Sequence, residues 1–320
     1  MRNYKRMYTA WIMVAVILMG LLPTQAAKKS TASTTTPARM TVTLQVLGDN
    51  KRTPEVSPDD VVVRQGKERL QVTGWKAARE AHAGLDLFIL IDDASDTSLG
   101  TQLNELRAFI NAQPPATSVG IGYMRNGTVQ IAQNFTTDHD KAAKALRLPI
   151  ASSGAYGSPY LSVIDLMKRW PEHPNRREII MVTDGIDRFR GGPRYPALSF
   201  VNPDVDSASR VAQRTGTIID TIFTRGIGRL GNNYWEIMNG QNGIAKLSEE
   251  TGGNSFYLGT FNPVSFKPYL DSIQKGLDNQ YLLEFDAAPG QKSGLQRVKL
   301  STEVAGVELA SADNVWVNAK

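Results

Sequence analysis

Short oxygen-bearing side chains gather where two apolar stretches of this 320-residue chain end. The first stretch, Leu87–Ile91, runs directly into carboxylates and hydroxyls, and the second ends in Asp184. A loop rich in glycine and hydroxyls lies between them in the sequence and contains Ser158. Oxygen ligands of this kind are the ones that a hard divalent cation prefers. The sequence therefore predicts a metal site with these candidate ligands: Asp92, Asp93, Ser95, Asp96, Thr97, Ser158 and Asp184.

The elements that would hold these side chains lie between residues 84 and 280. Continuous apolar strands alternate there with segments of helical periodicity, such as residues 99–113. Apolar strands of this kind are typical of a parallel sheet covered by helices on both faces. We expect a doubly wound, mostly parallel α/β domain, in which ligands bind outside the carboxyl ends of the strands. A single candidate ligand is more often a helix cap or turn residue, but three such loops at one edge favour a shared site.

Short strands broken by turns flank this region on both sides. Residues 41–83 and 281–320 contain them, and Val42, Leu44 and Val46 alternate as in a half-buried strand. Neither flank is long enough to form a stable sheet alone. We therefore expect the two flanks to pack together as one small β-rich unit.

The first 26 residues have the features of a secretory signal peptide. Three basic residues precede an apolar run from Thr9 to Leu22, and Thr24 and Ala26 place small side chains before the expected cut. An uncleaved membrane anchor is the alternative, although the run is shorter than the roughly 20 residues of a membrane span. We expect an exported protein, periplasmic or secreted, that contacts a membrane only if this segment is uncleaved. Residues 27–40 are polar and low in complexity, and are expected to form a flexible linker.

The charge of the chain gives little reason to expect a nucleic-acid partner. There are 36 basic and 31 acidic residues, a net charge of +5. The signal peptide contains three of the basic residues and none of the acidic ones, so the remainder has a net charge of +2. This balance favours neither nucleic acid nor an anionic membrane surface. Because the chain contains no cysteine, disulfides, thiol chemistry and cysteine-ligated zinc are excluded.

The acid-bearing loops resemble the metal-ion-dependent adhesion site of a von Willebrand factor type A domain. That site has an Asp-x-Ser-x-Ser loop after the first strand, a threonine in a second loop and an aspartate in a third. Asp184, in MVTDG, matches the third part, and Ser158, in GSPYLSVIDL, stands in the place of the threonine and keeps its hydroxyl. The resemblance spans nearly all of residues 84–280, and the flanking strands extend it to the bacterial VWFA-related exported proteins.

Two adjacent aspartates compete for the first position of the adhesion-site loop. Counting forward from Asp86 gives Asp92, which leaves Ala94 and an acid where the family has two hydroxyls. Counting back from the following helix gives Asp93, which keeps both hydroxyls. We prefer Asp93 on this chemistry, with Asp92 as the alternative.

The resemblance implies a non-enzymatic, exported binding or adhesion protein that engages a protein partner, with an acidic side chain of the partner completing the metal site. Mg²⁺ is the expected ion, and Ca²⁺ and Mn²⁺ are alternatives. A structural envelope component with a degenerate, metal-free site is the alternative function. A Mg²⁺-dependent hydrolase is a third, but no nucleophile elbow or phosphate-binding lysine loop occurs in the sequence.

A long loop after Asp184 is a candidate partner-binding surface. It runs from residue 189 to residue 203, and long loops next to a site often bind partners. A surface loop without a role is the alternative. Asp187, just before this loop, is expected to be a solvated acid. The candidate contact residues are Phe189, Arg190, Arg194 and Tyr195.

Overall fold

The structure, a computed structural model, describes residues 35–48, 54–150, 157–189, 202–228, 232–288, 290 and 292–319. The predicted signal peptide and most of the predicted linker lie outside the described residues, as do Arg190, Arg194 and Tyr195 of the candidate partner loop. Within the described ranges, no helix combines the length and the apolar character needed to cross a membrane.

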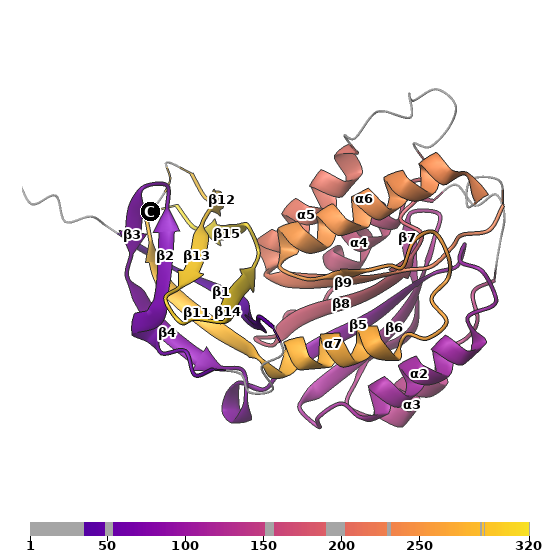
Figure 1. Cartoon of the computed structure of the whole chain (residues 1–320), viewed down its shortest axis with the longest axis horizontal. Coiled ribbons are helices and arrows are strands. Elements are labelled where there is room, and N and C mark those ends of the chain that lie inside the picture. The colour runs from indigo at the N-terminus through magenta and orange to yellow at the C-terminus, as the bar shows by residue number, and fades with distance from the viewer. Residues whose placement is uncertain are drawn as a thin grey trace, which may run out of the picture. The chain divides into compact units, whose positions relative to one another are not determined.

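A six-stranded sheet forms the centre of the α/β domain (Figure 1). Its strands are β5 (Leu85–Asp92), β6 (Thr117–Arg125), β7 (Thr128–Thr136), β8 (Arg176–Thr183), β9 (Thr217–Phe223) and β10 (Ser255–Phe256). Their order is β10-β9-β8-β5-β6-β7, and all neighbours are parallel except the antiparallel pair β6-β7. The chain starts in the middle at β5, builds out to β7 and returns to β8 beside β5. The carboxyl ends of β5 and β8 are therefore the switch point, where doubly wound sheets bind ligands.

Helices cover both faces of this sheet (Figure 1). The hydrophobic core on one face contains residues of α2 (Gly100–Asn111), α3 (His139–Lys144) and α7 (Lys267–Asp278). The core on the other face contains residues of α4 (Pro159–Lys168), α5 (Pro203–Thr215) and α6 (Tyr234–Thr251).

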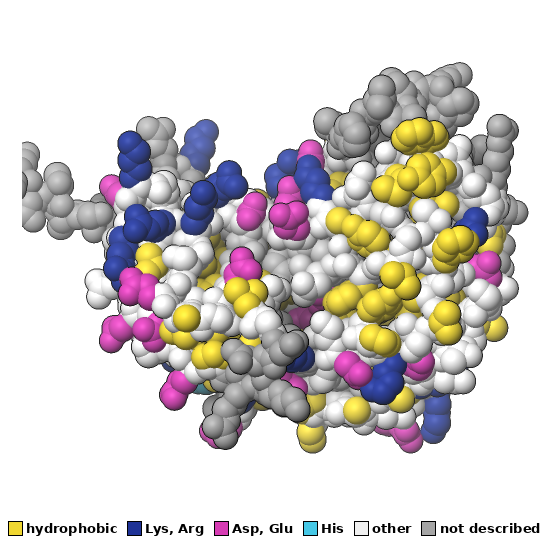
Figure 2. Space-filling model, in the orientation of Figure 1, with side chains coloured by type: hydrophobic (Ala, Val, Ile, Leu, Met, Phe, Trp, Pro, Cys, Tyr) yellow, Lys and Arg dark blue, Asp and Glu magenta, His cyan; other side chains and the backbone are white. Residues whose placement is uncertain are grey.

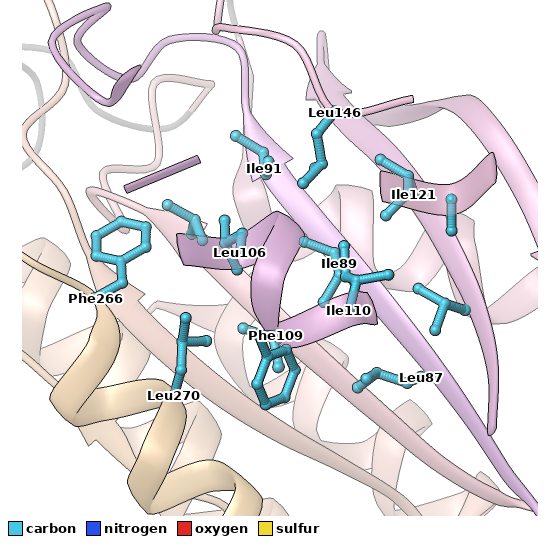
Figure 3. Packing of buried hydrophobic residues seen from close by; sticks show 14 of the residues in the cluster. Leu87, Ile89, Ile91, Leu106, Phe109, Ile110, Ile121, Leu146, Phe266 and Leu270 are labelled. Carbon is cyan, nitrogen blue, oxygen red and sulfur yellow. The ribbon is translucent and has the colours of Figure 1, made fainter. Parts of the chain in front are cut away.

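The apolar run of β5 contributes to both cores. Leu87, Ile89 and Ile91 pack into the core with α2 and α7 (Figure 3), whereas Phe88 and Leu90 pack into the core on the opposite face. Successive side chains of a strand point to opposite faces, so a strand covered on both sides is apolar throughout. All eight residues of β5 are buried, which confirms the expected doubly covered sheet.

The strands before and after the α/β domain pair with one another. β1 (Thr36–Val46) lies between β11 (Gln280–Ala287) and β14 (Val307–Ser311) and is antiparallel to both, and β4 (Val72–Ala77) pairs with the other edge of β11. These strands share one hydrophobic core with most of the remaining short strands. The predicted fold class is confirmed: a doubly wound sheet with a small β-rich unit. Its other elements are β2 (Val61–Gln65), β3 (Glu68–Leu70), β12 (Gly294–Arg297), β13 (Lys299–Thr302), β15 (Asn314–Val317) and the 3₁₀ helices η1 (Pro58–Asp60) and η2 (Glu80–His82).

The boundary predicted for the linker needs correction, because residues 36–40 are the first part of β1. Ala38 and Met40 are buried and face the core, while Pro37 and Arg39 are exposed. Pro37 fits this strand because β1 pairs with β14 only from Val42 onward, so one edge of β1 is open at Pro37. The exposed residues at the start of β1 are polar or proline, and for this reason the segment resembles a linker in composition.

Candidate functional site

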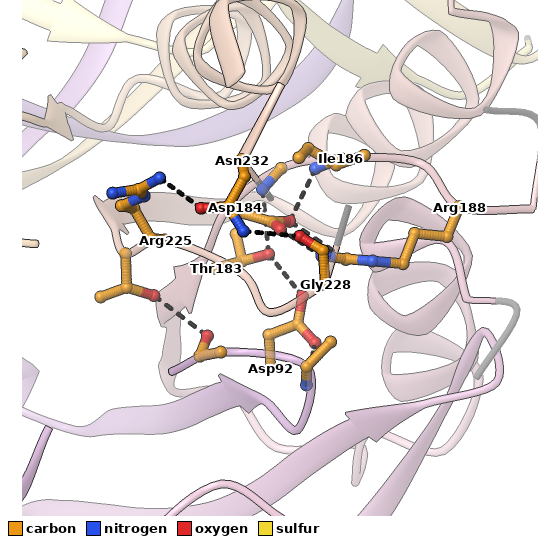
Figure 4. A network of polar contacts seen from close by, with 12 residues as sticks. Asp92, Thr183, Asp184, Ile186, Arg188, Arg225, Gly228 and Asn232 are labelled. Atoms are coloured by element: carbon orange, nitrogen blue, oxygen red, sulfur yellow. Dashed lines mark hydrogen bonds and ion pairs between the residues drawn. The ribbon is translucent and has the colours of Figure 1, made fainter. Parts of the chain in front are cut away.

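Asp92 ends β5, and its carboxylate lies beside the end of β8 (Figure 4). One carboxylate oxygen accepts a hydrogen bond from the backbone N–H of Ala94 at 2.8 Å. The other accepts a hydrogen bond from the hydroxyl of Thr183, also at 2.8 Å. Thr183 directly precedes Asp184, and Asp92 is close enough to raise the pKa of the Asp184 carboxyl. Asp92 is therefore the aspartate of the first loop that neighbours Asp184.

Asp93 lies on the other side of the strand end and is bound by Arg147. The guanidinium donates two hydrogen bonds, of 2.7 and 2.9 Å, to the two carboxylate oxygens. The backbone N–H of Ile150 donates a third, at 3.3 Å. The Arg147 guanidinium also lies 3.7 Å from the centre of the Tyr123 ring. Of the two candidates for the first position of the adhesion-site loop, Asp92 is therefore the one beside Asp184, whereas Asp93, the preferred candidate, is paired with Arg147.

The remaining candidates in the first loop have other partners or are exposed. The hydroxyl of Ser95 is buried and bonds the hydroxyl of Thr224 at 3.0 Å. Asp96 accepts a hydrogen bond from the backbone N–H of Ser98 at 2.8 Å, and Thr97 is exposed. Ala94, at the first hydroxyl position when the loop is counted from Asp92, offers no side-chain oxygen.

Ser158 begins α4, where its hydroxyl caps the helix. The hydroxyl oxygen accepts a hydrogen bond from the backbone N–H of Leu161 at 3.4 Å. The same hydroxyl donates to a carboxylate oxygen of Asp187 at 3.1 Å, and Asn202 donates to that oxygen at 3.3 Å. Asp187 is 8% exposed, so the expectation of a solvated loop acid was wrong. Ser158 and Asp187 thus join the second and third loops.

Replacing Ser158 with alanine should lower the free energy of unfolding by about 1 kcal/mol, because the helix loses its cap. Urea unfolding measures this change. Ser207→Ala is the matched control, since Ser207 is half-buried inside α5 and is not the cap of that helix, and the stability of this variant should change by less than about 0.5 kcal/mol. Equal losses in the two variants would contradict the capping role.

Asp184 is bound by Arg188, four residues later (Figure 4). The two terminal nitrogens of the guanidinium donate to the two carboxylate oxygens, one of them at 3.2 Å. The backbone N–H of Ile186 donates to the same carboxylate at 2.9 Å. The side chains of Asp184 and Arg188 are 1% and 12% exposed, so this is an ion pair largely withdrawn from water.

Burial dominates the electrostatics of this pair. The pKa of the Asp184 carboxyl is raised to about 6, chiefly by burial; the Arg188 guanidinium opposes this rise and the Asp92 carboxylate adds to it. For Arg188, burial lowers the pKa of the guanidinium, but the carboxylates of Asp184 and Asp92 together raise it above its usual value. The guanidinium is thus the positive charge that both carboxylates share.

Gly226, in the loop after β9, leaves the room that this ion pair occupies. A Cβ atom at this position would overlap both the Asp184 carboxylate and the Arg188 guanidinium. The loop is held in place by backbone hydrogen bonds from Asp96 to Arg225 and from Ile227 to Ala94. The first loop and the loop after β9 therefore enclose the ion pair together.

The residues at this edge do not fit a divalent ion in the observed arrangement. Mg²⁺ needs near-octahedral oxygen coordination at about 2.1 Å, but the carboxylate oxygens of Asp92, Asp93 and Asp184 already accept hydrogen bonds from protein groups. The Ser158 hydroxyl is engaged with Asp187. In the part of the chain that the structure describes, no three acidic or histidine side chains are arranged to hold a metal.

Large apolar side chains are exposed around the same edge of the sheet. Of the ten such residues that the structure describes, seven lie on segments that follow the carboxyl ends of β8, β9 and β10. Leu148 and Ile150 lie in the segment after α3, where the N–H of Ile150 bonds Asp93, and Leu47 follows β1 outside the central sheet. Figure 2 shows apolar side chains gathered over α6 and over the segment between β10 and α7. The nine residues are Leu148, Ile150, Phe189, Tyr234, Trp235, Tyr257, Leu258, Phe261 and Val264.

No protein-family model and no curated protein matches the chain. Among solved structures, it is similar to an aerotolerance-related membrane protein from Bacteroides fragilis, with 11% identity over 61% of this chain and 99% of that chain and a TM-score of 0.42. It is similar to the protein BatB from Bacteroides thetaiotaomicron, with 15% identity over 60% and 97% of the two chains and a TM-score of 0.42. A von Willebrand factor type A protein from Catenulispora acidiphila has 10% identity over 90% and 75% and a TM-score of 0.44.

These identities and TM-scores are too low to assign the fold. We therefore assign it from the strand order. The order β10-β9-β8-β5-β6-β7 with one antiparallel edge strand, and the aspartates at the ends of β5 and β8, define a von Willebrand factor type A fold. The resemblance found in the sequence is correct at the level of the fold.

Two arginines complete the site, and the sequence pattern did not single them out. The one available pattern was the spacing of Asp184 and Arg188 in TDGIDR, since a basic residue four positions after an acid can reach it in a tight turn. Arg147 lies 54 residues from Asp93, and no local pattern connects them.

Proposed function

We propose that this chain is a non-enzymatic, exported module that binds a protein partner through the carboxyl edge of its central sheet. The observation that carries the proposal is the concentration of exposed apolar residues at that edge. Trp235, Phe261 and Leu258 are 61%, 68% and 75% exposed. Aromatic residues and arginine are enriched where proteins contact one another, and exposed apolar clusters mark such surfaces.

The partner is a protein that presents apolar side chains to this edge. Tyr234 and Trp235 pack edge to face at the start of α6, with ring centres 5.7 Å apart, and form a stiff aromatic contact surface. The resemblance further implies an acidic side chain on the partner. No ion is expected to meet such a side chain, because the carboxylates at this edge do not fit a divalent ion and Arg188 is already paired with Asp184. Binding is therefore proposed to be independent of metal.

A hydrolytic function has less support at this edge. A cavity of about 20 Å³ lies beside Asp92 and Arg188, which is room for about one water molecule. A structural envelope component shares the metal-free site, but its surface would not need nine exposed apolar residues around one edge of the sheet.

The test is a pull-down from bacterial envelope extracts with the wild-type chain and with Trp235→Ala/Phe261→Ala. We expect the double variant to retain less than about a tenth of the captured partner, because aromatic anchors dominate interface energies. EDTA should not change capture by the wild-type chain. Leu47→Ala is the control, since Leu47 is 51% exposed but lies outside the edge.

Equal capture by the wild-type chain and the edge variant, with loss in Leu47→Ala, would place the binding surface elsewhere. Loss of capture in EDTA would refute the metal-independent form of the proposal.

A further inference from the structure

The ends of β5 and β8 bring two buried carboxylates, Asp92 and Asp184, together. Asp92 is 6% exposed and Asp184 1% exposed. Buried like charges are unfavourable unless a positive charge neutralises them. In the adhesion sites that this one resembles, a divalent ion lies among such carboxylates. Here a cation of the chain itself is close to both.

The backbone holds Arg188 where it reaches these carboxylates. The backbone N–H of Arg188 donates to the carbonyl of Gly157 at 2.8 Å, which fixes the turn between β8 and α5 against the second loop. Only 12% of the Arg188 side chain is exposed to solvent. Its terminal nitrogens span both oxygens of Asp184, the bidentate geometry that a guanidinium offers and an ammonium does not.

Independent departures from the family pattern agree with this arrangement. Ala94 removes one hydroxyl ligand, and the hydroxyl of Ser95 is turned to Thr224. Asp93, the extra carboxylate, has a cation of its own in Arg147. Gly226 leaves space for the guanidinium, which a Cβ atom would occupy. Ligands that a metal would need are absent or engaged, and each added carboxylate has a protein partner.

We propose that the Arg188 guanidinium is the resident cation of this site and takes the place of the divalent ion that the resemblance implies. The positive charge of the site is then always present, because it belongs to the chain, and it does not depend on the supply of metal. This inference does not rest on the proposed partner binding, because it is measured on the chain alone.

The experiment compares Mn²⁺ binding and thermal unfolding in the wild-type chain and in Arg188→Ala. Mn²⁺ is followed by electron paramagnetic resonance, in which the signal of the free ion decreases on binding. We expect the wild-type chain to leave that signal unchanged and to keep its Tm in Mn²⁺. Arg188→Ala should lower the Tm by about 10 °C, since a buried pair is broken. Mn²⁺ should recover part of that loss, because an ion can enter the vacated space.

Arg225→Ala is the matched control. Arg225 is in the neighbouring loop, and its side chain bonds Asn232 rather than a carboxylate. Its Tm should change by about 2 °C or less and should not respond to Mn²⁺. If Arg188→Ala does not fold, Arg188→Lys replaces it: a single ammonium keeps the charge but not the two parallel bonds, so its Tm should fall by a smaller amount.

Two outcomes would overturn the inference. One is stoichiometric Mn²⁺ binding by the wild-type chain that is abolished by Asp184→Asn, which would mean that an ion displaces the guanidinium. The other is a Tm of Arg188→Ala equal to that of the wild-type chain, or a Tm of Arg188→Lys equal to it where Arg188→Ala does not fold.

Discussion

Replacing Arg147 with alanine is expected to lower the free energy of unfolding by about 3 kcal/mol. The substitution leaves the Asp93 carboxylate, whose side chain is 3% exposed, with only the 3.3 Å hydrogen bond from Ile150. Breaking a buried ion pair costs roughly 3–5 kcal/mol, and the lower end applies because the Arg147 side chain is itself 39% exposed. The variant also loses the contact of the guanidinium with the Tyr123 ring. Urea unfolding measures the effect.

A second substitution separates the ion pair from the other contacts of Arg147. Asp93→Asn in the Arg147→Ala background removes the uncompensated charge, so the double variant should be more stable than Arg147→Ala alone. Lys144→Ala is the control, because Lys144 and Asp140 form an exposed pair at 3.9 Å that should contribute nothing measurable. A double variant that is no more stable than Arg147→Ala would show that Asp93 carries no unfavourable charge.

The buried carboxyl pair of Glu178 and Asp220 should make the chain less stable as the pH rises. Glu178 on β8 and Asp220 on β9 are 2% and 4% exposed. Burial raises the pKa of the Glu178 carboxyl well above its ordinary value of 4.5, and the charge of Asp220 raises it further. Gln280 and Arg176 oppose this shift, but less strongly. Glu178 therefore keeps a proton in the folded chain that it loses in the unfolded chain.

The sign of the pH dependence follows from this difference in bound protons. Where the folded state binds more protons than the unfolded state, stability falls with rising pH. The contribution of Glu178 is fully present below pH 4.5 and is lost as the pH rises through the pKa of the folded state. Glu178→Gln has no proton to lose, so it should match the wild-type chain near pH 4.5 and exceed its stability by about 2 kcal/mol near pH 8.

Chemical unfolding of the wild-type chain and Glu178→Gln from pH 4.5 to pH 8 measures this effect. Asp140→Asn is the control, since the Asp140 side chain is 73% exposed, and its difference from the wild-type chain should not vary over this range. A constant difference between the wild-type chain and Glu178→Gln would contradict the raised pKa of Glu178.

The central sheet could be predicted because a strand that is buried on both faces is apolar at every position. Leu87–Ile91 is apolar throughout since its alternate residues enter two different cores. The same property hides the direction of the next two residues. Because the residues on both faces are apolar, there is no polar–apolar alternation to show which residues point to which face. The sequence pattern therefore could not decide between Asp92 and Asp93. The structure distinguishes the two aspartates by their partners: Thr183 bonds Asp92, and Arg147 bonds Asp93.

The cations of the site could not be predicted, because neither lies in a periodic element. Arg188 follows a glycine turn at Gly185, whose φ of 68° redirects the chain. Arg147 lies in the segment after α3. In sequence both resemble ordinary surface arginines, and only the path of the backbone brings them onto buried carboxylates. The sequence correctly grouped the acids by strand end but could not supply their counter-charges.

The pairing of β1 with β11 determines how the chain would carry a pulling force. Eight residue pairs, from Thr36 with Ala287 to Thr43 with Gln280, join the two antiparallel strands. The N-terminal end of β1 and the N-terminal end of β11, which leads back to α7, lie at opposite ends of this ladder. Tension between a tether upstream of Thr36 and a load applied through α7 would slide these strands lengthwise. All eight pairs would then resist in shear together, whereas a ladder pulled from one end opens one pair at a time.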